Sequence, residues 1–264
     1  MHPTLLCPVC RAPLSRGEHT YACQAGHSYD IARHGYVNLL SGKPPAIGDH
    51  REMIAARRRT LESGIYAPLR AALTEAAKGC GGLYLDAGCG EGYYTEALAG
   101  CADATVGVDI SKEALRAAHR RLPTATLSVA SVYHLPIADA SVSLLSCIFA
   151  PGAMEEYHRV LAPGGLFLWV IPGARHLYSM KTILYETPYE NEVAPYHLDG
   201  FRFCEDRAVR YEATLASPEA IADLFAMTPY FYRTPTAGRE RLLALERLTV
   251  EADFHILTYR KESV

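Results

Sequence analysis

The chain has 264 residues, of which 49% are hydrophobic and 21% are charged, and its formal net charge at pH 7 is −3. This size and composition are typical of a soluble globular protein with one large domain, or with a small module joined to a domain of ordinary size. No segment approaches 18 uninterrupted apolar residues, and the first eight residues lack the pattern of a secretory signal, so the sequence predicts a cytoplasmic protein without a membrane partner.

Positive charge is concentrated near the N-terminus. Residues 1–60 contain eight Lys and Arg against four Asp and Glu, whereas the rest of the chain contains 18 against 25. A basic end on an acidic body fits contact with a polyanion. The alternative is that a small metal-stabilised module is basic without binding a polyanion.

Four residues of this basic segment have the spacing of a metal site, and they are Cys7, Cys10, Cys23 and His27. The pattern Cys-x2-Cys-x12-Cys-x3-His supplies the four ligands of a closed, tetrahedral Zn2+ site, and metal binding would then provide most of the folding free energy of so short a segment. In a reducing compartment, such cysteines are better explained as ligands or buried thiols than as disulfides. The alternatives are a redox-active Cys-x-x-Cys pair, or His19 or His34 as the fourth ligand. We predict a structural zinc module over residues 1–42.

A linker and two helices are expected over residues 43–82. Gly and Pro prevent regular structure around residues 41–49, after which Asp49 is expected to cap a helix that ends near Leu61. A second helix is expected from Pro68 to about Lys78, before a run of glycines. After these glycines, the sequence pattern changes to that of short strands alternating with helices.

From residue 83 onward, short apolar strands alternate with helices. Strands are expected at residues 83–86, 105–109, 125–130, 142–149 and 166–171, with helices at residues 93–98, 111–121 and 154–161. This alternation predicts an α/β domain over residues 83–264, in which helices cover both faces of a mostly parallel sheet. Residues 250–259 alternate like one more strand, whereas residues 172–215 give no clear pattern.

A glycine-rich turn follows the first strand, and its glycines are Gly88, Gly90 and Gly92. Glycines between a strand and a helix let a ligand approach the backbone. A dinucleotide site would have its third glycine at position 93, where this chain has Tyr93. Asp86 ends the first strand, and Asp109 ends the second about 20 residues past the turn, where a carboxylate can accept hydrogen bonds from ribose hydroxyls.

This combination resembles motif I and the following acidic motif of class I S-adenosylmethionine-dependent methyltransferases. The resemblance implies a Rossmann-like domain with a seven-stranded sheet, whose antiparallel last strand would come from residues 250–259. It also implies S-adenosyl-L-methionine as the methyl donor, with residues 131–135 near its adenine and residues 148–151 facing the substrate. A degenerate nucleotide-binding domain is the alternative.

Several further stretches resemble the RlmA family of 23S ribosomal RNA guanine-N1 methyltransferases, and they are residues 29–40, 53, 56–58, 64–66, 172–177 and, less closely, 227–229. The likeness extends from Cys7 to about Leu177, and the turn at residues 88–95 is similar to the Gram-negative branch of the family. The resemblance implies methylation of N1 of a guanine in a 23S RNA hairpin, and it suggests a homodimer.

The resemblance also implies site residues. Tyr66 and His176 would join the loop of Gly90 and Glu91 around the cofactor, although the residues alone suggest a core aromatic and the start of a helix. The expected cofactor-binding set is Tyr66, Asp86, Gly88, Gly90, Glu91, Gly92, Asp109 and His176.

Methylation of guanine N1 needs a base, because that nitrogen carries a proton at neutral pH. His134 and His176 are candidates since histidine titrates near neutrality, but the sequence does not identify the base. The target base must leave any pair and stack on an aromatic ring, for which the candidates are Tyr36, Tyr93, Tyr94 and Phe149. The candidates for RNA contact are Arg33, His34, Arg51, Arg57, Arg58 and Arg59, although the three adjacent arginines cannot all face one side of a helix.

Two other functions stay open at this point. A small-molecule methyltransferase seldom needs a basic metal module, and a non-catalytic RNA-binding or ribosome-assembly factor would not need the intact set from Asp86 to Asp109. Cofactor binding and the identity of the methylated molecule separate the three functions.

Overall fold

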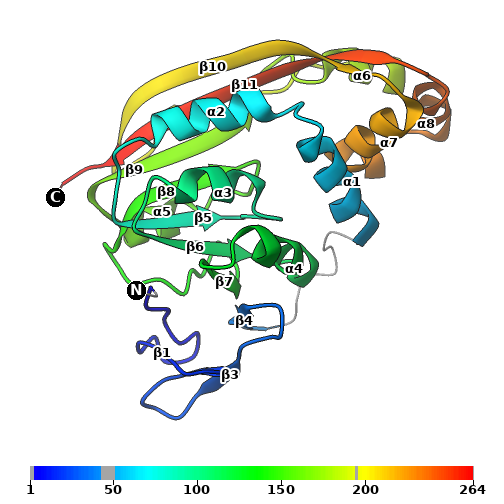
Figure 1. The fold of residues 1–264 in the computed structure, drawn as a ribbon. Coiled ribbons are helices and arrows are strands. Elements are labelled where there is room, and N and C mark those ends of the chain that lie inside the picture. Colours follow the sequence, from blue (N-terminus) through cyan, green and yellow to red (C-terminus); the bar gives the residue numbers. More distant parts are fainter. Residues whose placement is uncertain (1–2, 43–50, 194–195, 264) are drawn as a thin grey trace.

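One sheet of eight strands organises this computed structural model (Figure 1), which describes residues 3–42, 51–193 and 196–263. The strand order is β10-β11-β9-β8-β5-β6-β7-β4. The strands are β4 (Tyr36–Asn38), β5 (Leu83–Ala87), β6 (Ala104–Asp109), β7 (Thr126–Val129), β8 (Val142–Ile148), β9 (Leu161–Pro172), β10 (Phe201–Leu215) and β11 (Leu248–Lys261). The first strand of the expected domain, β5, therefore lies inside the sheet between β8 and β6.

The strand directions confirm the predicted α/β class. Strands β5 to β9 pair in parallel, while β11 runs antiparallel to both of its neighbours, β9 and β10. The strand predicted at residues 250–259 is this antiparallel β11. The domain supplies the seven expected strands, and β4 adds an eighth by pairing in parallel with β7. The sequence does not predict β4 in this sheet, because three residues have too little pattern to show where they pair.

Helices cover both faces of the sheet, and they are α1 (Arg51–Glu62), α2 (Ala67–Ala76), α3 (Tyr93–Ala99), α4 (Lys112–Arg121), α5 (Met154–Val160), α6 (Tyr178–Leu184), α7 (Pro218–Ala226), η1 (Pro229–Tyr232) and α8 (Thr236–Leu243). Side chains of a strand point alternately to its two faces. Leu145 and Phe167 accordingly pack with α5 and the N-terminal module. Leu144 and Leu168 pack with α2, α3, α6 and α7 on the other face. Two large cores thus share one sheet, and a smaller third cluster packs α4 against β7.

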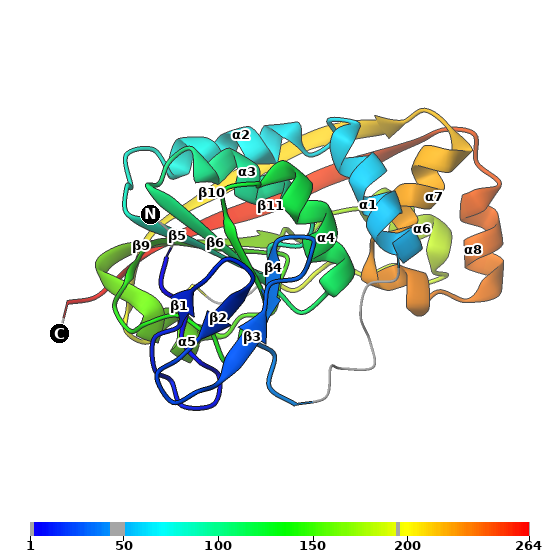
Figure 2. The same ribbon diagram turned by 60° about the horizontal axis from the view of Figure 1, so that its bottom comes forward.

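The N-terminal module is docked on the domain, where β4 pairs with β7 at the edge of the sheet and lies beside α4 (Figure 2). It contains a small antiparallel sheet of β1 (Ser15–Arg16), β2 (Thr20–Ala22) and β3 (Ser28–Asp30). Leu5 is fully buried in the core that α5 shares, and the N–H of Leu6 donates to the carbonyl of Pro136 at 2.9 Å. Arg11 adds a hydrogen bond from Nη1 to the carbonyl of Leu135 at 3.0 Å. The module is therefore attached by apolar packing and by backbone pairing.

Helices α1, α6, α7 and α8 gather beyond one end of the sheet (Figure 1). Of these helices, α6 lies within residues 172–215, for which the sequence gives no clear pattern. The predicted helix cap Asp49 and most of the predicted linker lie outside the described residues. Within the described ranges, no helix is long and apolar enough to span a membrane.

Candidate functional site

A cavity of about 1080 Å3 opens at the carboxyl ends of the parallel strands. Its walls include residues 88–91 after β5, residues 109–110 at the end of β6, residues 130–133 after β7 and residues 148–151 at the end of β8. Residues of α1 and η1 also line it. Open parallel sheets bind ligands at this edge. The volume lies at the upper end of the roughly 300–1,000 Å3 usual for small-molecule sites, so it suits a cofactor together with part of a substrate.

The glycine-rich turn after β5 presents bare backbone to this cavity. Gly88 has a φ of 88°, and a Cβ placed on it would lie 2.4 Å from the Cβ of Ala150. Gly90 has a φ of 53°, and its N–H donates to Oδ2 of Asp109 at 2.8 Å. Both glycines line the cavity. A side chain at position 88 would therefore collide with the wall and also strain the backbone.

Asp109 stands at the end of β6 with its carboxylate oriented by backbone amides. In addition to Gly90, the N–H of Ser111 donates to Oδ1 at 2.8 Å. The hydroxyl of Ser111 in turn caps α4 by accepting a hydrogen bond from the N–H of Ala114 at 3.2 Å. The start of α4, the glycine turn and the end of β6 are thereby tied together. This carboxylate is held ready at the cavity wall for charge-assisted hydrogen bonds from ligand hydroxyls.

Two residues of the expected cofactor set, Asp86 and Gly92, are absent from the lining of the cavity. The buried carboxylate of Asp86 accepts hydrogen bonds from Thr95 Oγ1 at 2.5 Å and Ser146 Oγ at 2.7 Å. Burial raises the pKa of this carboxyl to about 6. A Cβ on Gly92 would lie 2.8 Å from Cδ1 of Leu122, so the glycine permits α3 to pack closely against the end of α4. Asp86 and Gly92 therefore lie beneath the glycine-rich turn and help to hold its shape, without lining the cavity.

Glu91 lines the cavity with a side chain that is only 2% exposed. One carboxylate oxygen, Oε1, is 3.4 Å from Nη2 of Arg121. The other, Oε2, is buried and has no hydrogen-bond partner among the described residues. Burial raises the pKa of this group, against the opposing effect of Arg121. A buried acceptor without a partner at a cavity wall is matched by a ligand that brings a hydrogen-bond donor.

His176 and Tyr66 both line the cavity. Both rings contact Phe254, whose ring centre is 4.5 Å from that of His176 and 5.6 Å from that of Tyr66. Burial lowers the pKa of His176 to about 4, so its ring is neutral at pH 7. Its Nδ1 accepts a long hydrogen bond of 3.4 Å from the N–H of Asp253. The tautomer that this contact favours carries its proton on Nε2 and is a hydrogen-bond donor at that atom.

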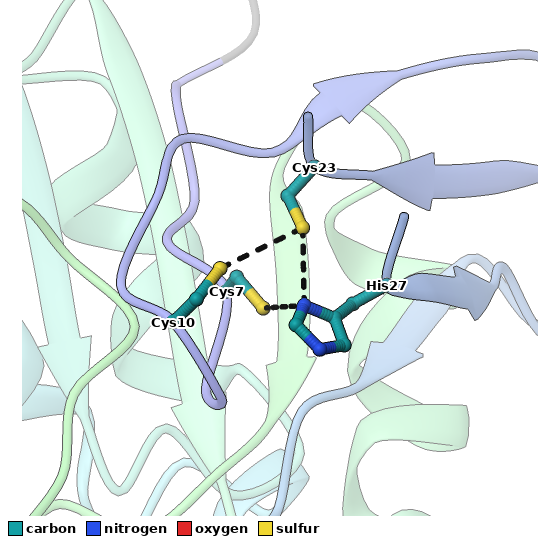
Figure 3. A group of neighbouring side chains, drawn as sticks. All are labelled: Cys7, Cys10, Cys23 and His27. Atoms are coloured by element: carbon teal, nitrogen blue, oxygen red, sulfur yellow. Dashed lines mark hydrogen bonds between the residues drawn. The ribbon is translucent and has the colours of Figure 1, made fainter. Parts of the chain in front are cut away.

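The four predicted metal ligands come together in the N-terminal module (Figure 3), with all their donor atoms within 4.8 Å of one another. The Sγ atoms of Cys10 and Cys23 are 3.7 Å apart, and Nδ1 of His27 is 3.6 Å from Sγ of Cys7 and 3.3 Å from Sγ of Cys23. A tetrahedral zinc ion with Zn–S bonds of about 2.3 Å separates its ligand atoms by roughly 3.5–3.8 Å. The donor set therefore fits structural zinc, and His19 and His34 lie outside the group.

Cys7 is prepared for metal binding by its surroundings. Burial raises the pKa of its thiol, but hydrogen bonds from the Tyr29 hydroxyl and from the amides of Cys10 and Val9 outweigh burial and lower it to about 6. The Tyr29 hydroxyl lies 3.2 Å from the Cys7 sulfur. A thiolate is the form that coordinates zinc, and outer contacts of this kind orient the ligand.

Comparisons with known proteins find relatives of both the zinc module and the domain that holds the cavity. A family model described as "RlmA, N-terminal" matches residues 5–43, and one described as "Methyltransferase domain" matches residues 85–169. The 23S rRNA (guanine(748)-N(1))-methyltransferase of Streptomyces fradiae is 38% identical over 68% of this chain and 67% of its own length. A Micromonospora griseorubida protein, named provisionally as a 23S rRNA (guanine-N(1)-)-methyltransferase, is 37% identical over 98% of this chain and 99% of its own. YxjB of Bacillus subtilis (strain 168), with the same provisional name, is 30% identical over 95% of each chain.

The chain belongs to the family of 23S rRNA (guanine-N1)-methyltransferases. As a member of this family it is an S-adenosylmethionine-dependent methyltransferase with a structural zinc site. The class I Rossmann-like fold with an N-terminal zinc module is confirmed.

A buried lysine supports the wall of the methyltransferase cavity, and no sequence motif predicts it. Lys181 of α6 is completely buried, and its Nζ donates to the carbonyl of Tyr189 at 3.0 Å and to Oδ1 of Asn191 at 2.6 Å. Burial lowers the pKa of this ammonium. Asn191 lines the cavity and donates from Nδ2 to the carbonyl of Gly173 at 2.8 Å. Lys181 thereby fixes the segment that leads to His176.

Several aromatic side chains surround the cavity of this methyltransferase, and three of them are substantially exposed, namely Tyr133 (54%), Phe149 (45%) and Tyr232 (59%). Phe149 has a φ of 55°, which is rare for a bulky residue and marks a strained position at the end of β8. Tyr93 and Tyr94 also line the cavity but are mostly covered, while Tyr36 is buried against α4 and lies outside it. Tyr133 and Tyr232 are not among the stacking candidates predicted from the sequence, because nothing local distinguishes them from core residues.

The candidate base His134 does not line the cavity, and its side chain is exposed. The arginines expected to contact RNA have different surroundings. Arg59 makes two hydrogen bonds of 2.7 and 2.6 Å to the carboxylate of Asp223, so it joins α1 to α7. Arg58 donates to Glu62 one helical turn further on, at 2.9 Å. Arg57 lines the cavity.

Proposed function

We propose that this protein transfers a methyl group from S-adenosylmethionine to N1 of a guanine in a hairpin of 23S ribosomal RNA. The observation behind the proposal is the cavity in which an oriented carboxylate, a buried carboxylate without a full set of partners and exposed aromatic rings lie together. The names of the relatives at 37 and 38% identity support the nucleotide and the atom.

We assign the cofactor to the walls formed by the glycine turn and the end of β6. Asp109 accepts hydrogen bonds from ribose hydroxyls, the backbone of Gly88 and Gly90 approaches the ligand closely, and Oε2 of Glu91 accepts from a donor group. Asp86 and Gly92 hold the turn from below, and Tyr66 and His176 border the same cavity. When bound, S-adenosylmethionine supplies a methyl group on a positively charged sulfur, and the protein contributes position and electrostatics.

We assign the target guanine to the part of the cavity with exposed aromatic rings. Phe149, Tyr133 and Tyr232 offer faces on which a base that has left its pair can stack. Transfer of the N1 proton to a base or to water leaves negative charge on the guanine, including its O6. The neutral ring of His176, with its proton on Nε2, is suited to donate a hydrogen bond to that oxygen. In this state His176 acts as a donor and not as the base.

The proposal extends to partners and location. The zinc module of residues 1–42 recognises the RNA hairpin, residues 43–82 connect it to the methyltransferase domain of residues 83–264, and the protein acts in the cytoplasm as a homodimer. The likeness of the turn at residues 88–95 to the Gram-negative branch leads us to propose that the protein belongs to that branch. The match of residues 5–43 to the "RlmA, N-terminal" family model and the basic N-terminal charge support the role given to the zinc module.

Methyl transfer from labelled S-adenosylmethionine to protein-free 23S RNA tests the proposal, with the RNA taken from a strain that lacks the gene. Primer extension then locates the site, because N1-methylguanine blocks base pairing. We expect one new stop at a guanine in a hairpin, lost in Asp109→Ala and kept in the matched variant Asp199→Ala, which changes an exposed carboxylate. Cofactor binding without label in RNA would contradict the proposal, and label in a small molecule would establish the metabolite alternative.

A further inference from the structure

One face of α4 has a row of cationic side chains. Lys112, Arg116 and Arg120 are spaced by four residues, so they lie along one side of the helix. The opposite side is anchored in the core by Ala114 and Ala118, which are buried. Lys112 and Arg120 are exposed, and Arg116 is half-buried. We call Lys112, Arg116 and Arg120 the α4 row.

The zinc module lies directly beside this row. A Cβ on Gly35 would lie 2.3 Å from Cε1 of His119, so the backbone of the module contacts α4 with no room for a side chain. Next to that contact, Nε of the exposed Arg33 donates to Nε2 of His34 at 3.0 Å. The α4 row and Arg33 are thus two parts of one surface, contributed by the domain and by the module.

The electrostatics of His34 show how close these cations are to one another. Burial lowers the pKa of His34, and the positive charges of Arg33, Arg116 and Arg120 lower it further. His34 therefore stays neutral at pH 7 and can accept the hydrogen bond from Arg33. Like charges held together without an equal number of carboxylates create a positive potential that attracts a polyanion.

Acidic neighbours offset only part of this charge. Glu113 pairs with Arg116 and lies 3.9 Å from Arg51 at the start of α1. Arg121 belongs to the other side of α4, where it contacts Glu62, Glu91 and Glu96. The surface therefore keeps its net positive charge on the side of α4 that faces the module.

The α4 row starts near the cavity, since residues 109–110 line the cavity and Lys112 follows two residues later. Arg51 lies at the first residue of α1, next to α4, and Arg57 in the same helix lines the cavity. A nucleic acid that follows the cations from Arg33 over the α4 row to α1 reaches the cavity where we place the target base.

We propose that the α4 row, together with Arg33, binds the phosphate backbone of the substrate RNA and directs the target hairpin to the cavity. This inference rests on the proposed function, because it takes RNA as the substrate. It adds a helix of the methyltransferase domain to an RNA-binding surface whose candidates from sequence lie only in the zinc module and α1. Contacts of this kind position RNA without selecting its sequence.

The salt dependence of RNA binding tests the inference, since each phosphate contact contributes about 0.7–0.9 to the slope of log K against log salt concentration. The variant Lys112→Ala/Arg120→Ala removes two exposed cations of the row. The matched control Arg202→Ala/Arg207→Ala removes two exposed cations from β10, at the other edge of the sheet. Affinity for protein-free 23S RNA is measured for wild type and both variants at several salt concentrations, and calorimetric binding of S-adenosylmethionine checks that each is folded.

We expect the slope of Lys112→Ala/Arg120→Ala to be smaller than that of wild type by roughly 1.4–1.8. The control and the cofactor affinities should not change. If Lys112→Ala/Arg120→Ala bound RNA with the salt slope and affinity of the wild type, while the wild type methylated the RNA, this inference would be overturned and the proposed function would stand. A wild-type protein that binds cofactor but neither binds nor methylates the RNA would overturn the proposed function and this inference with it.

Discussion

The cofactor cavity and the cationic surface of α4 present their charges in opposite ways. In the cavity, the carboxylate of Asp109 is oriented by two backbone amides and that of Glu91 is buried. On α4, Lys112 and Arg120 are exposed to solvent. A small ligand is recognised by polar groups whose positions are fixed before it arrives, whereas a long polyanion is attracted by summed charge that salt screens. The two regions should therefore respond differently to the same perturbation.

Removal of zinc should have the largest effect and should fall on the RNA side. Structural zinc contributes apparent binding free energies of about 10–16 kcal/mol in small zinc modules at pH 7, so chelation or Cys23→Ser should unfold much of residues 5–30 and abolish most RNA affinity. Zinc content, RNA binding and cofactor binding are measured together. The control is Cys204→Ser, which changes an exposed thiol on β10 outside the ligand group. Equal loss of cofactor and RNA binding would contradict the separation of the two regions.

Loss of the buried ammonium of Lys181 should have a smaller effect, confined to the cavity. Lys181→Met leaves the carbonyl of Tyr189 and Oδ1 of Asn191 without their donor, while the cost of burying a charge disappears. We expect a net loss of about 1 kcal/mol in stability and roughly 5–10-fold weaker cofactor binding, with an unchanged salt slope for RNA. Lys78→Met, at an exposed lysine, serves as the control. Unchanged cofactor affinity would show that Lys181 does not position the wall.

The smallest effect concerns pH. The pKa of His176 is lowered to about 4 in the folded protein, mainly by burial, which outweighs the nearby carboxylates of Asp253 and Glu251. Between the unfolded value near 6.5 and this folded value, the unfolded chain binds a proton that the folded chain does not bind. Stability should therefore fall as pH decreases through this window, and fall less steeply in His176→Gln. Thermal unfolding of the wild type and of His176→Gln from pH 7 to pH 4 measures this dependence. An identical decrease of stability with pH in the two proteins would contradict the burial of a neutral ring.

The sequence predicts the parts of both sites that depend on local spacing. The zinc ligands and the turn from Gly88 to Gly92 lie close together in the chain, so motif spacing is enough to find them. The hydrogen bond from Arg59 to Asp223 depends on tertiary packing, because the two residues lie far apart in the chain. The hydrogen bond from Lys181 to Asn191 reaches into a loop without a regular pattern. The contact of the module with α4 likewise arises only when β4 pairs with β7.

The most direct test of the account is a pair of binding measurements on two variants, Asp109→Ala and Lys112→Ala/Arg120→Ala. Loss of charge-assisted hydrogen bonds worth about 1.5–3 kcal/mol each should weaken S-adenosylmethionine binding to Asp109→Ala by roughly 100-fold or more, with wild-type RNA affinity. Lys112→Ala/Arg120→Ala should show the reverse, with wild-type cofactor affinity and a reduced salt slope for RNA. Asp109→Ala binding the cofactor as tightly as wild type would contradict the assignment of the cavity as the cofactor site.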